Sequence, residues 1–157
     1  MALRSIALLF IGLLLSACGA INVKPGMTRE EAVAAAGQPT RVVALPDGTR
    51  LQYSGQPSLQ QAIMVDLDSQ GRVRSIDSVL NAAHFQRIVP DQWTRERVEL
   101  EFGPPARIDH TALWAGDILT YRWYDVENLL YWIYIDAQGT VRRTEQGIEL
   151  LRDQDID

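Results

Sequence analysis

A pattern of about 66 residues occurs twice in this chain and constrains its fold more than any other feature. Lys24 to Arg41 reads KPGMTREEAVAAAGQPTR, and Pro90 to Arg107 reads PDQWTRERVELEFGPPAR. When these segments are aligned 66 positions apart, six residues are identical. The identical pairs are Thr28 and Thr94, Arg29 and Arg95, Glu30 and Glu96, Gly37 and Gly103, Pro39 and Pro105, and Arg41 and Arg107. Self-similarity at one spacing predicts a tandem duplication.

The repeat continues beyond these segments with an offset of 68. Leu51-Gln52-Tyr53 matches Leu119-Thr120-Tyr121, and DSQGRVR from Asp68 matches DAQGTVR from Asp136. The second copy therefore has two extra residues before its tyrosine. We expect a first module at residues 24–80, and a second module with a C-terminal tail at residues 81–157.

Each copy begins with a helix signal. Thr28 is a good N-cap residue, and Glu31 completes a capping box, which predicts a helix over Arg29–Ala36. Thr94 predicts the equivalent helix over Arg95–Phe102, without the box because Arg97 replaces the glutamate. A glycine and a proline follow each helix and predict where it ends.

Three or four hairpin-linked strands follow each helix, and Asn81–Ile88 is expected to form a short helix between the copies. We therefore expect an α+β fold, a tandem repeat of a short helical element packed on a three- to four-stranded antiparallel sheet. The expected strands are Arg41–Leu45, Arg50–Ser54, Gln61–Leu67 and Arg72–Leu80, then Ala106–Leu113, Ile118–Asp125, Leu129–Ile135 and Thr140–Glu145.

Residues 1–17 form an expected export signal. Arg4 is the only charge among them, and an apolar run from Ile6 to Leu15 is too short to span a bilayer as a helix. Leu15-Ser16-Ala17-Cys18 then resembles the bacterial lipobox. The resemblance implies a lipoprotein signal peptide at residues 1–17, covalent diacylglycerol and an N-acyl chain on Cys18, and a lipidated tether at residues 18–23. Gly19 at the next position implies the outer membrane.

The GMTREE helix start from Gly26, the G-x-P stop, the Leu-x-Tyr strand and the D-x-x-G-x-V hairpin together resemble the SmpA/OmlA lipoproteins. This family includes the BamE component of the outer-membrane β-barrel assembly machine. Two modules in tandem are similar instead to the β-lactamase inhibitor protein. The resemblance implies a non-enzymatic lipoprotein on the periplasmic face of the outer membrane, which binds a protein partner to support β-barrel protein assembly or envelope integrity. The alternative is an inhibitor or binding module for a periplasmic enzyme.

Composition and motifs argue against most other functions. The net charge of −5 disfavours nucleic-acid binding, which needs a basic surface. One cysteine and two histidines, His84 and His110, leave little for a metal site, and no nucleophile or phosphate-binding motif is present. Asp66 to Gly71 resembles a calcium loop, but Asp77 stands where the bidentate Glu is needed, so a hairpin turn is expected. We expect no cofactor apart from the acyl chains, no metal and no small-molecule substrate.

Aromatic residues mark a candidate binding surface in the second copy, which holds all four tryptophans. Strand periodicity places Leu51, Tyr53, Ile63, Val65 and Leu67 toward the helix in the first copy, and Leu119, Tyr121, Trp123, Tyr131, Ile133 and Ile135 in the second. The opposite face of the second copy is then apolar and also includes Ile118. Its candidate partner-binding residues are Tyr124, Leu130, Trp132 and Tyr134. The alternative is that this face packs against the first copy or the N-terminal segment.

Overall fold

The computed structural model describes residues 22–150, which form two four-stranded antiparallel sheets. Strands are ordered as they occur along the chain in both sheets, so neighbouring strands are linked by simple hairpins. Sheet 1 comprises β1 (Arg41–Leu45), β2 (Gly48–Ser54), β3 (Ala62–Asp68) and β4 (Val73–Ser78). Sheet 2 comprises β5 (Arg107–Thr111), β6 (Trp114–Tyr124), β7 (Asn128–Asp136) and β8 (Val141–Ile148).

The helices are short, and their ends are those that the capping residues predict. The predicted bounds of α1 (Arg29–Ala36) and α3 (Arg95–Phe102) are confirmed, and α2 (Ala82–Phe85) lies within the expected 81–88 segment. Thr28 and Glu31 form the complete capping box of α1, whereas Thr94 alone caps α3. Each long helix stops at a glycine of positive φ, Gly37 or Gly103, a conformation that side chains disfavour.

The expected α+β fold with a tandem helix-on-sheet repeat is wrong. The chain is mostly β, with 48% of the described residues in strands and 16% in helices. The physical reason is that the capping and stop signals leave only eight residues for α1 and α3 and four for α2. These 20 helical residues are outweighed by eight strands, although the lengths of α1 and α3 are those predicted. In addition, α3 is not confined to its own sheet, because it also packs against sheet 1.

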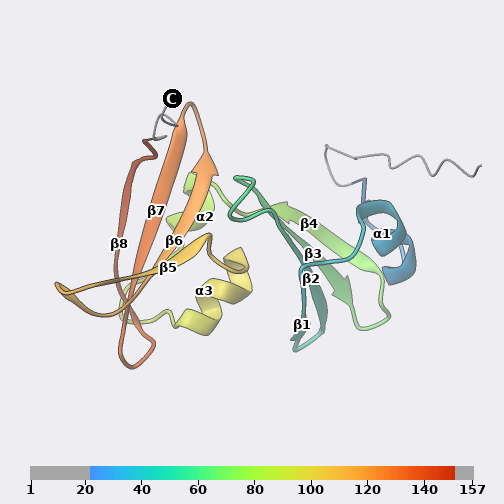
Figure 1. The fold of residues 1–157 in the computed structure, drawn as a ribbon. Coiled ribbons are helices and arrows are strands. Elements are labelled where there is room, and N and C mark those ends of the chain that lie inside the picture. The colour runs from blue at the N-terminus through green and yellow to red at the C-terminus, as the bar shows by residue number, and fades with distance from the viewer. Residues whose placement is uncertain (1–21, 151–157) are drawn as a thin grey trace, which may run out of the picture.

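The elements stack with α1 on one side of sheet 1, and with α2 and α3 between the two sheets (Figure 1). One hydrophobic core lies between α1 and sheet 1 and includes Ala32, Leu51 and Val65. A larger core holds Ala62 and Met64 of sheet 1 together with residues of α2, α3 and sheet 2. The two sheets therefore share one core across the helices.

Matching positions of the two halves make matching contacts. Thr28 bridges to Arg72, and Thr94 bridges to Thr140. Asp68 and Asp136 each accept two backbone N–H groups in the turn that follows, at 2.9 Å. These turns are hairpin turns, as expected. The Asp68 carboxylate is occupied by backbone hydrogen bonds.

Candidate partner-binding face

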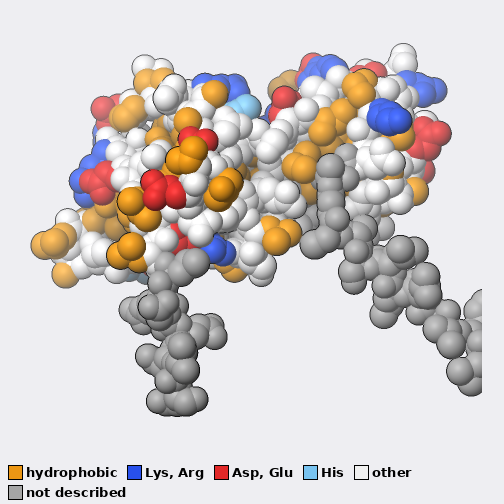
Figure 2. Space-filling view, turned by 90° about the horizontal axis from the view of Figure 1, so that it is seen from above, with side chains coloured by type: hydrophobic (Ala, Val, Ile, Leu, Met, Phe, Trp, Pro, Cys, Tyr) orange, Lys and Arg blue, Asp and Glu red, His pale blue; other side chains and the backbone are white. Residues whose placement is uncertain are grey.

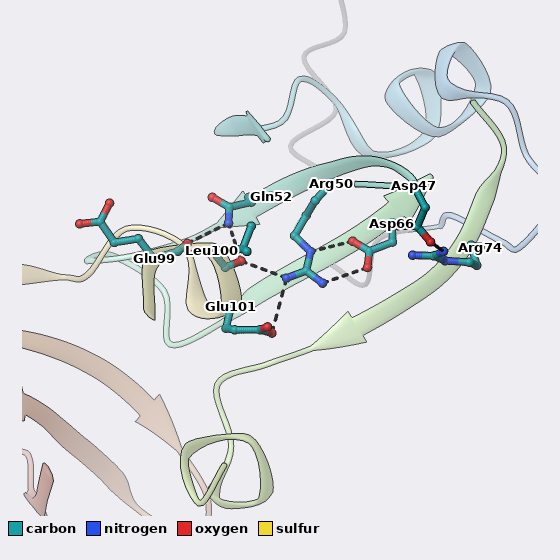
Figure 3. A network of polar contacts seen from close by, with 8 residues as sticks. All are labelled: Asp47, Arg50, Gln52, Asp66, Arg74, Glu99, Leu100 and Glu101. Carbon is teal, nitrogen blue, oxygen red and sulfur yellow. Dashed lines mark hydrogen bonds and ion pairs between the residues drawn. The ribbon is translucent and has the colours of Figure 1, made fainter. Parts of the chain in front are cut away.

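The helix α3 covers the middle strands of sheet 1, β2 and β3, on the face that points away from α1. Gln52 is fully buried there, and its Nε2 donates to the carbonyls of Glu99 and Leu100 at 2.9 and 3.0 Å (Figure 3). Met64 on the neighbouring strand belongs to the same core as Phe102. The hydrogen bonds of Gln52 join residues almost 50 positions apart in the sequence.

Arg50 is the charged centre of this contact. Its guanidinium forms two hydrogen bonds with the Asp66 carboxylate, at 2.7 and 2.9 Å, and a third with the Leu100 carbonyl at 3.0 Å. Glu101 lies 3.5 Å from the same guanidinium. The hydrogen bonds to Asp66 raise the pKa of Arg50 above its ordinary value. The polar side chains of sheet 1 thus bind α3.

A second contact between the two halves joins the loop after β2 to the end of β6. The loop after β2 places Gln56 beside Arg122, where the Gln56 amide and the Arg122 backbone exchange hydrogen bonds of 2.6 and 3.0 Å. Arg122 also bonds the Pro57 carbonyl and pairs with Glu149. The two halves are therefore held together at two separated points.

Sheet 2 differs from sheet 1, because no described helix or strand covers its face opposite the helices, although the loop after β2 reaches one end of that face through Arg122. At the 68-residue offset, Ala62, Met64 and Asp66, which face α3, correspond to Leu130, Trp132 and Tyr134. The first three are buried, whereas the last three are only half-buried and belong to neither hydrophobic core. We call the side of sheet 2 that carries Leu130, Trp132 and Tyr134 the open face; Ile118, opposite Tyr134, shares this side but is buried.

The other side of sheet 2 carries the core residues that strand periodicity predicts. The side chains predicted to be internal are in the core between the sheets, where Phe85 stacks on Tyr131 with ring centroids 4.1 Å apart. Tyr121 is fully buried, and its hydroxyl donates to the Gly103 carbonyl at 2.8 Å. Burial raises the pKa of Tyr121 well above its ordinary value, so this tyrosine is neutral. The confirmed set is Leu119, Tyr121, Trp123, Tyr131, Ile133 and Ile135.

Three of the four candidate residues lie together, and one lies apart. Leu130, Trp132 and Tyr134 follow one another along the open face of β7. Tyr124 ends β6 opposite Asn128 and is 60% exposed. The open face is therefore a half-buried aromatic surface on β7, and Tyr124 is a separate exposed ring at the end of the sheet.

Sequence reasoning missed three residues that complete the open face. Trp114 meets Tyr134 edge to face, with ring centroids 5.3 Å apart. The Arg143 guanidinium lies 3.8 Å from the Tyr134 ring centroid, a cation–π contact, and pairs with Glu145. Trp114 shares the even-numbered phase of Ile118, which could have indicated its place. Arg143 and Glu145 gave no such signal.

Tyr134 and Trp132 are held in defined positions. The Tyr134 hydroxyl donates to Glu145 at 2.7 Å, and this bond raises the pKa of Tyr134 above its ordinary value. The Trp132 ring lies over Gly147 so closely that an added Cβ would be 2.9 Å from it. A rigid, partly exposed aromatic cluster of this kind is typical of the central residues of protein interfaces.

A hollow of about 340 Å³ lies between β1 and the first turns of α3. Three of its charged side chains are paired with one another, since Arg41 and Arg95 both contact Glu99, at 3.3 and 3.0 Å. Arg95 also pairs with Asp117. The hollow is lined by no serine, cysteine or histidine nucleophile. The arrangement fixes α3 against sheet 1 and offers no evident reaction chemistry.

Residues 22–150 show no group of three or more His, Cys, Asp or Glu side chains that could hold a metal ion. His84 lies in α2, where its Nδ1 is 3.0 Å from the Asn81 side-chain oxygen. Cys18 and the predicted signal lie outside the described residues. Within the described part, no helix has the length and apolar character needed to cross a membrane.

Comparisons with known proteins leave the family open. No family model matches the chain, and no curated protein matches it. Among solved structures, a DUF4309 family protein (YjgB) from Bacillus subtilis is similar over 78% of each chain, with 16% identity and a TM-score of 0.34. Similarity at this level carries no argument about function. The resemblance to the SmpA/OmlA lipoproteins and to the β-lactamase inhibitor protein stays a prediction.

Proposed function

We propose that this chain is a non-enzymatic lipoprotein that is anchored through Cys18 on the periplasmic face of the outer membrane and binds a protein partner. The partner that the family resemblance favours is the outer-membrane β-barrel assembly machine, and the role is barrel assembly or envelope integrity. The observation that carries the anchor is the lipobox sequence Leu15-Ser16-Ala17-Cys18. Several acyl chains on one residue give stable membrane attachment.

The open face supports the binding role. Its aromatic side chains are partly exposed, whereas the matching positions of sheet 1 are buried against α3. Aromatic residues and arginine are enriched in protein interfaces, and this face combines Trp132, Tyr134 and Arg143. A partner that covers this face would bury the side chains of sheet 2, as α3 buries the matching side chains of sheet 1.

The alternative is an inhibitor-like module that binds a periplasmic enzyme. In the β-lactamase inhibitor protein, which the two-module sequence resembles, the open faces of the sheets bind the partner. Here α3 occupies the middle of that face of sheet 1 through Gln52 and Arg50, so within residues 22–150 only sheet 2 leaves this face without a helix on it. This difference favours the lipoprotein with a scaffold role over the inhibitor.

The test is crosslinking and pull-down of the lipidated protein from bacterial envelopes. We expect recovery of the barrel-assembly core with the wild type and its loss with Trp132→Ala/Tyr134→Ala. Val42→Ala, which changes an exposed apolar residue of sheet 1, is the matched control and should bind as the wild type does. Absence of the assembly core from the wild-type sample would contradict the proposed partner. Inhibition of a purified periplasmic hydrolase would favour the alternative.

A further inference from the structure

Exposed apolar side chains are concentrated at one end of sheet 2. Nine large hydrophobic residues are exposed within the described chain, and five of them lie at the end where β6 and β8 finish and β7 begins. Val126 and Leu150 are each 85% exposed there. We call this group the apolar tip; its members are Leu59, Tyr124, Val126, Ile148 and Leu150.

Strand pairing places the members of the tip at the same end of sheet 2, although Tyr124 and Ile148 point to opposite faces of the sheet. Val126 is in the turn between β6 and β7, and Ile148 pairs with Leu129 immediately after that turn. Leu59 comes from the first half, where Gln56 bonds the Arg122 backbone and Gln60 bonds Glu149 at 3.1 Å. Exposed apolar groups gathered from three separate segments mark a contact surface, since soluble surfaces rarely collect them.

The tip lies on the side of the molecule from which the chain enters. In Figure 1 the blue start of the described chain and the C-terminal end of sheet 2 both lie toward the top. Val23 is buried in the core beside α1, only five residues after Cys18. Five residues reach at most about 17 Å when fully extended. An anchor on Cys18 would therefore keep the α1 end of the protein within this distance of the membrane surface.

We propose that the apolar tip is a second membrane contact, which inserts into the headgroup region of the bilayer. The proposal rests on the lipid anchor of the proposed function. Tyrosine suits this region, because its ring is apolar and its hydroxyl can contact water. Aliphatic side chains at loop ends can enter the apolar part of the same region. The anchor is attached at the sheet 1 half of the molecule, and the tip lies at the sheet 2 half, on the same side. With both in contact with the bilayer, the long axis of the protein lies along the membrane surface.

The charges at the tip indicate which headgroup charge the tip can contact. Asp125 and Glu127 flank Val126 and are both exposed. Figure 2, which looks down on this end of the molecule, shows acidic and hydrophobic side chains interspersed on the lobe of the second half. Carboxylates are repelled by anionic headgroups within about a Debye length. The tip is therefore expected to contact neutral, zwitterionic phospholipid and to enter only to a shallow depth.

A single fluorescent label tests this contact. Cys18 is the only cysteine of the chain, and acylation blocks its thiol, so one engineered cysteine in the lipidated protein can be labelled alone. Val126→Cys carries an environment-sensitive dye at the tip. Leu113→Cys is the matched control, since Leu113 is 98% exposed at the opposite end of β6, about 33 Å away along that strand. The lipidated protein is placed in phosphatidylcholine vesicles, and flotation verifies attachment.

We expect the dye at position 126 to shift its emission to shorter wavelength and to be quenched by a lipid with a nitroxide near the headgroup, but not by one deep in the chain. The dye at position 113 should show neither effect. Replacing part of the phosphatidylcholine by phosphatidylglycerol should reduce both effects at position 126. If the protein floats with the vesicles but the two labels behave alike, the tip contact is wrong and the anchor stands. Failure to float would instead contradict the anchor of the proposed function.

Discussion

The guanidinium of Arg50 forms a two-point ion pair with Asp66 on the neighbouring strand, at 2.7 and 2.9 Å, and both side chains are at least 86% buried beneath α3. The third hydrogen bond of Arg50 reaches Leu100 in the other half. The charge pair inside sheet 1 is thus also part of the joint between the two sheets.

Arg50→Ala should destabilise the protein, because it leaves the Asp66 carboxylate buried without its partner. Loss of one member of a buried pair costs about 3 kcal/mol, which corresponds to roughly 10 °C in melting temperature. Arg74→Ala is the control, since Arg74 pairs with Asp47 on the surface of the same half (Figure 3). That exposed pair should contribute little. Equal melting temperatures of the two variants would contradict the role of Arg50 in the joint.

Tyr121→Phe should cost about 1–2 kcal/mol, because it leaves the buried Gly103 carbonyl without its donor. Tyr53 occupies the matching position in the first half, where its hydroxyl bonds the Gly37 carbonyl at 3.3 Å at the surface. Water can replace that hydroxyl, so Tyr53→Phe should cost less than about 0.5 kcal/mol. Chemical denaturation of both variants measures the difference. A larger loss of stability for Tyr53→Phe than for Tyr121→Phe would show that burial does not determine how much these two hydrogen bonds stabilise the protein.

Asp136 should contribute to the pH dependence of stability. The hydrogen bond from the Thr140 backbone lowers the pKa of Asp136 below its ordinary value. A carboxylate with a depressed folded-state pKa stabilises the protein above its unfolded pKa, and this contribution is lost as the pH falls through the folded pKa. Asp136→Asn should therefore lower the melting temperature at pH 7, and the difference from wild type should shrink below about pH 4. Asp125→Asn in the exposed turn is the control, and a difference for Asp136→Asn that stays constant down to pH 2 would argue against this linkage.

Gly147→Ala should displace the Trp132 ring, because the added Cβ would meet two of its atoms at 2.9 Å. We expect a changed tryptophan fluorescence spectrum and weaker partner capture in the envelope pull-down, with the fold retained. Gln146→Ala on the same strand is the control, since Gln146 points away from the open face. Normal capture by Gly147→Ala despite a changed spectrum would indicate that Trp132 is not part of the binding surface.

Cys18→Ser should abolish acylation, because serine offers no thiol for thioether formation. Growth with radioactive palmitate followed by gel electrophoresis measures the label on the protein. The matched control is Ser16→Ala, which keeps a small residue before the cysteine and should be labelled as the wild type is. A labelled Cys18→Ser protein would falsify the lipobox interpretation.

Local signals were readable from the sequence, and distant contacts were not. The bounds of α1 and α3 followed from Thr28, Thr94 and the two stop glycines, because capping acts within one helical turn. Strand faces followed from the two-residue period. The failure concerned where α3 packs: its contact with Gln52 joins residues 47 positions apart, and no period or motif encodes that distance.

The sequence predicts some residues of the open face and not others, because periodicity acts within one strand. Leu130, Trp132 and Tyr134 share one strand and one phase, so periodicity grouped them. Tyr124 shares that phase on β6 but ends its strand, where the sheet no longer carries it beside the others. Arg143 could not be foreseen, because its contact with the Tyr134 ring depends on the registration of β7 against β8.

The position of α3 between the sheets makes each half depend on the other. A chain shortened to the first half would expose the amide of Gln52 and the side chain of Met64, both almost completely buried in the whole protein. A chain shortened to the second half would expose the apolar residues of α3 that now face sheet 1. We expect either fragment to be much less stable than the whole protein, because it would expose these buried groups to water. Mutation could reshape the outer surfaces of such a molecule over time, but deletion could no longer remove either half.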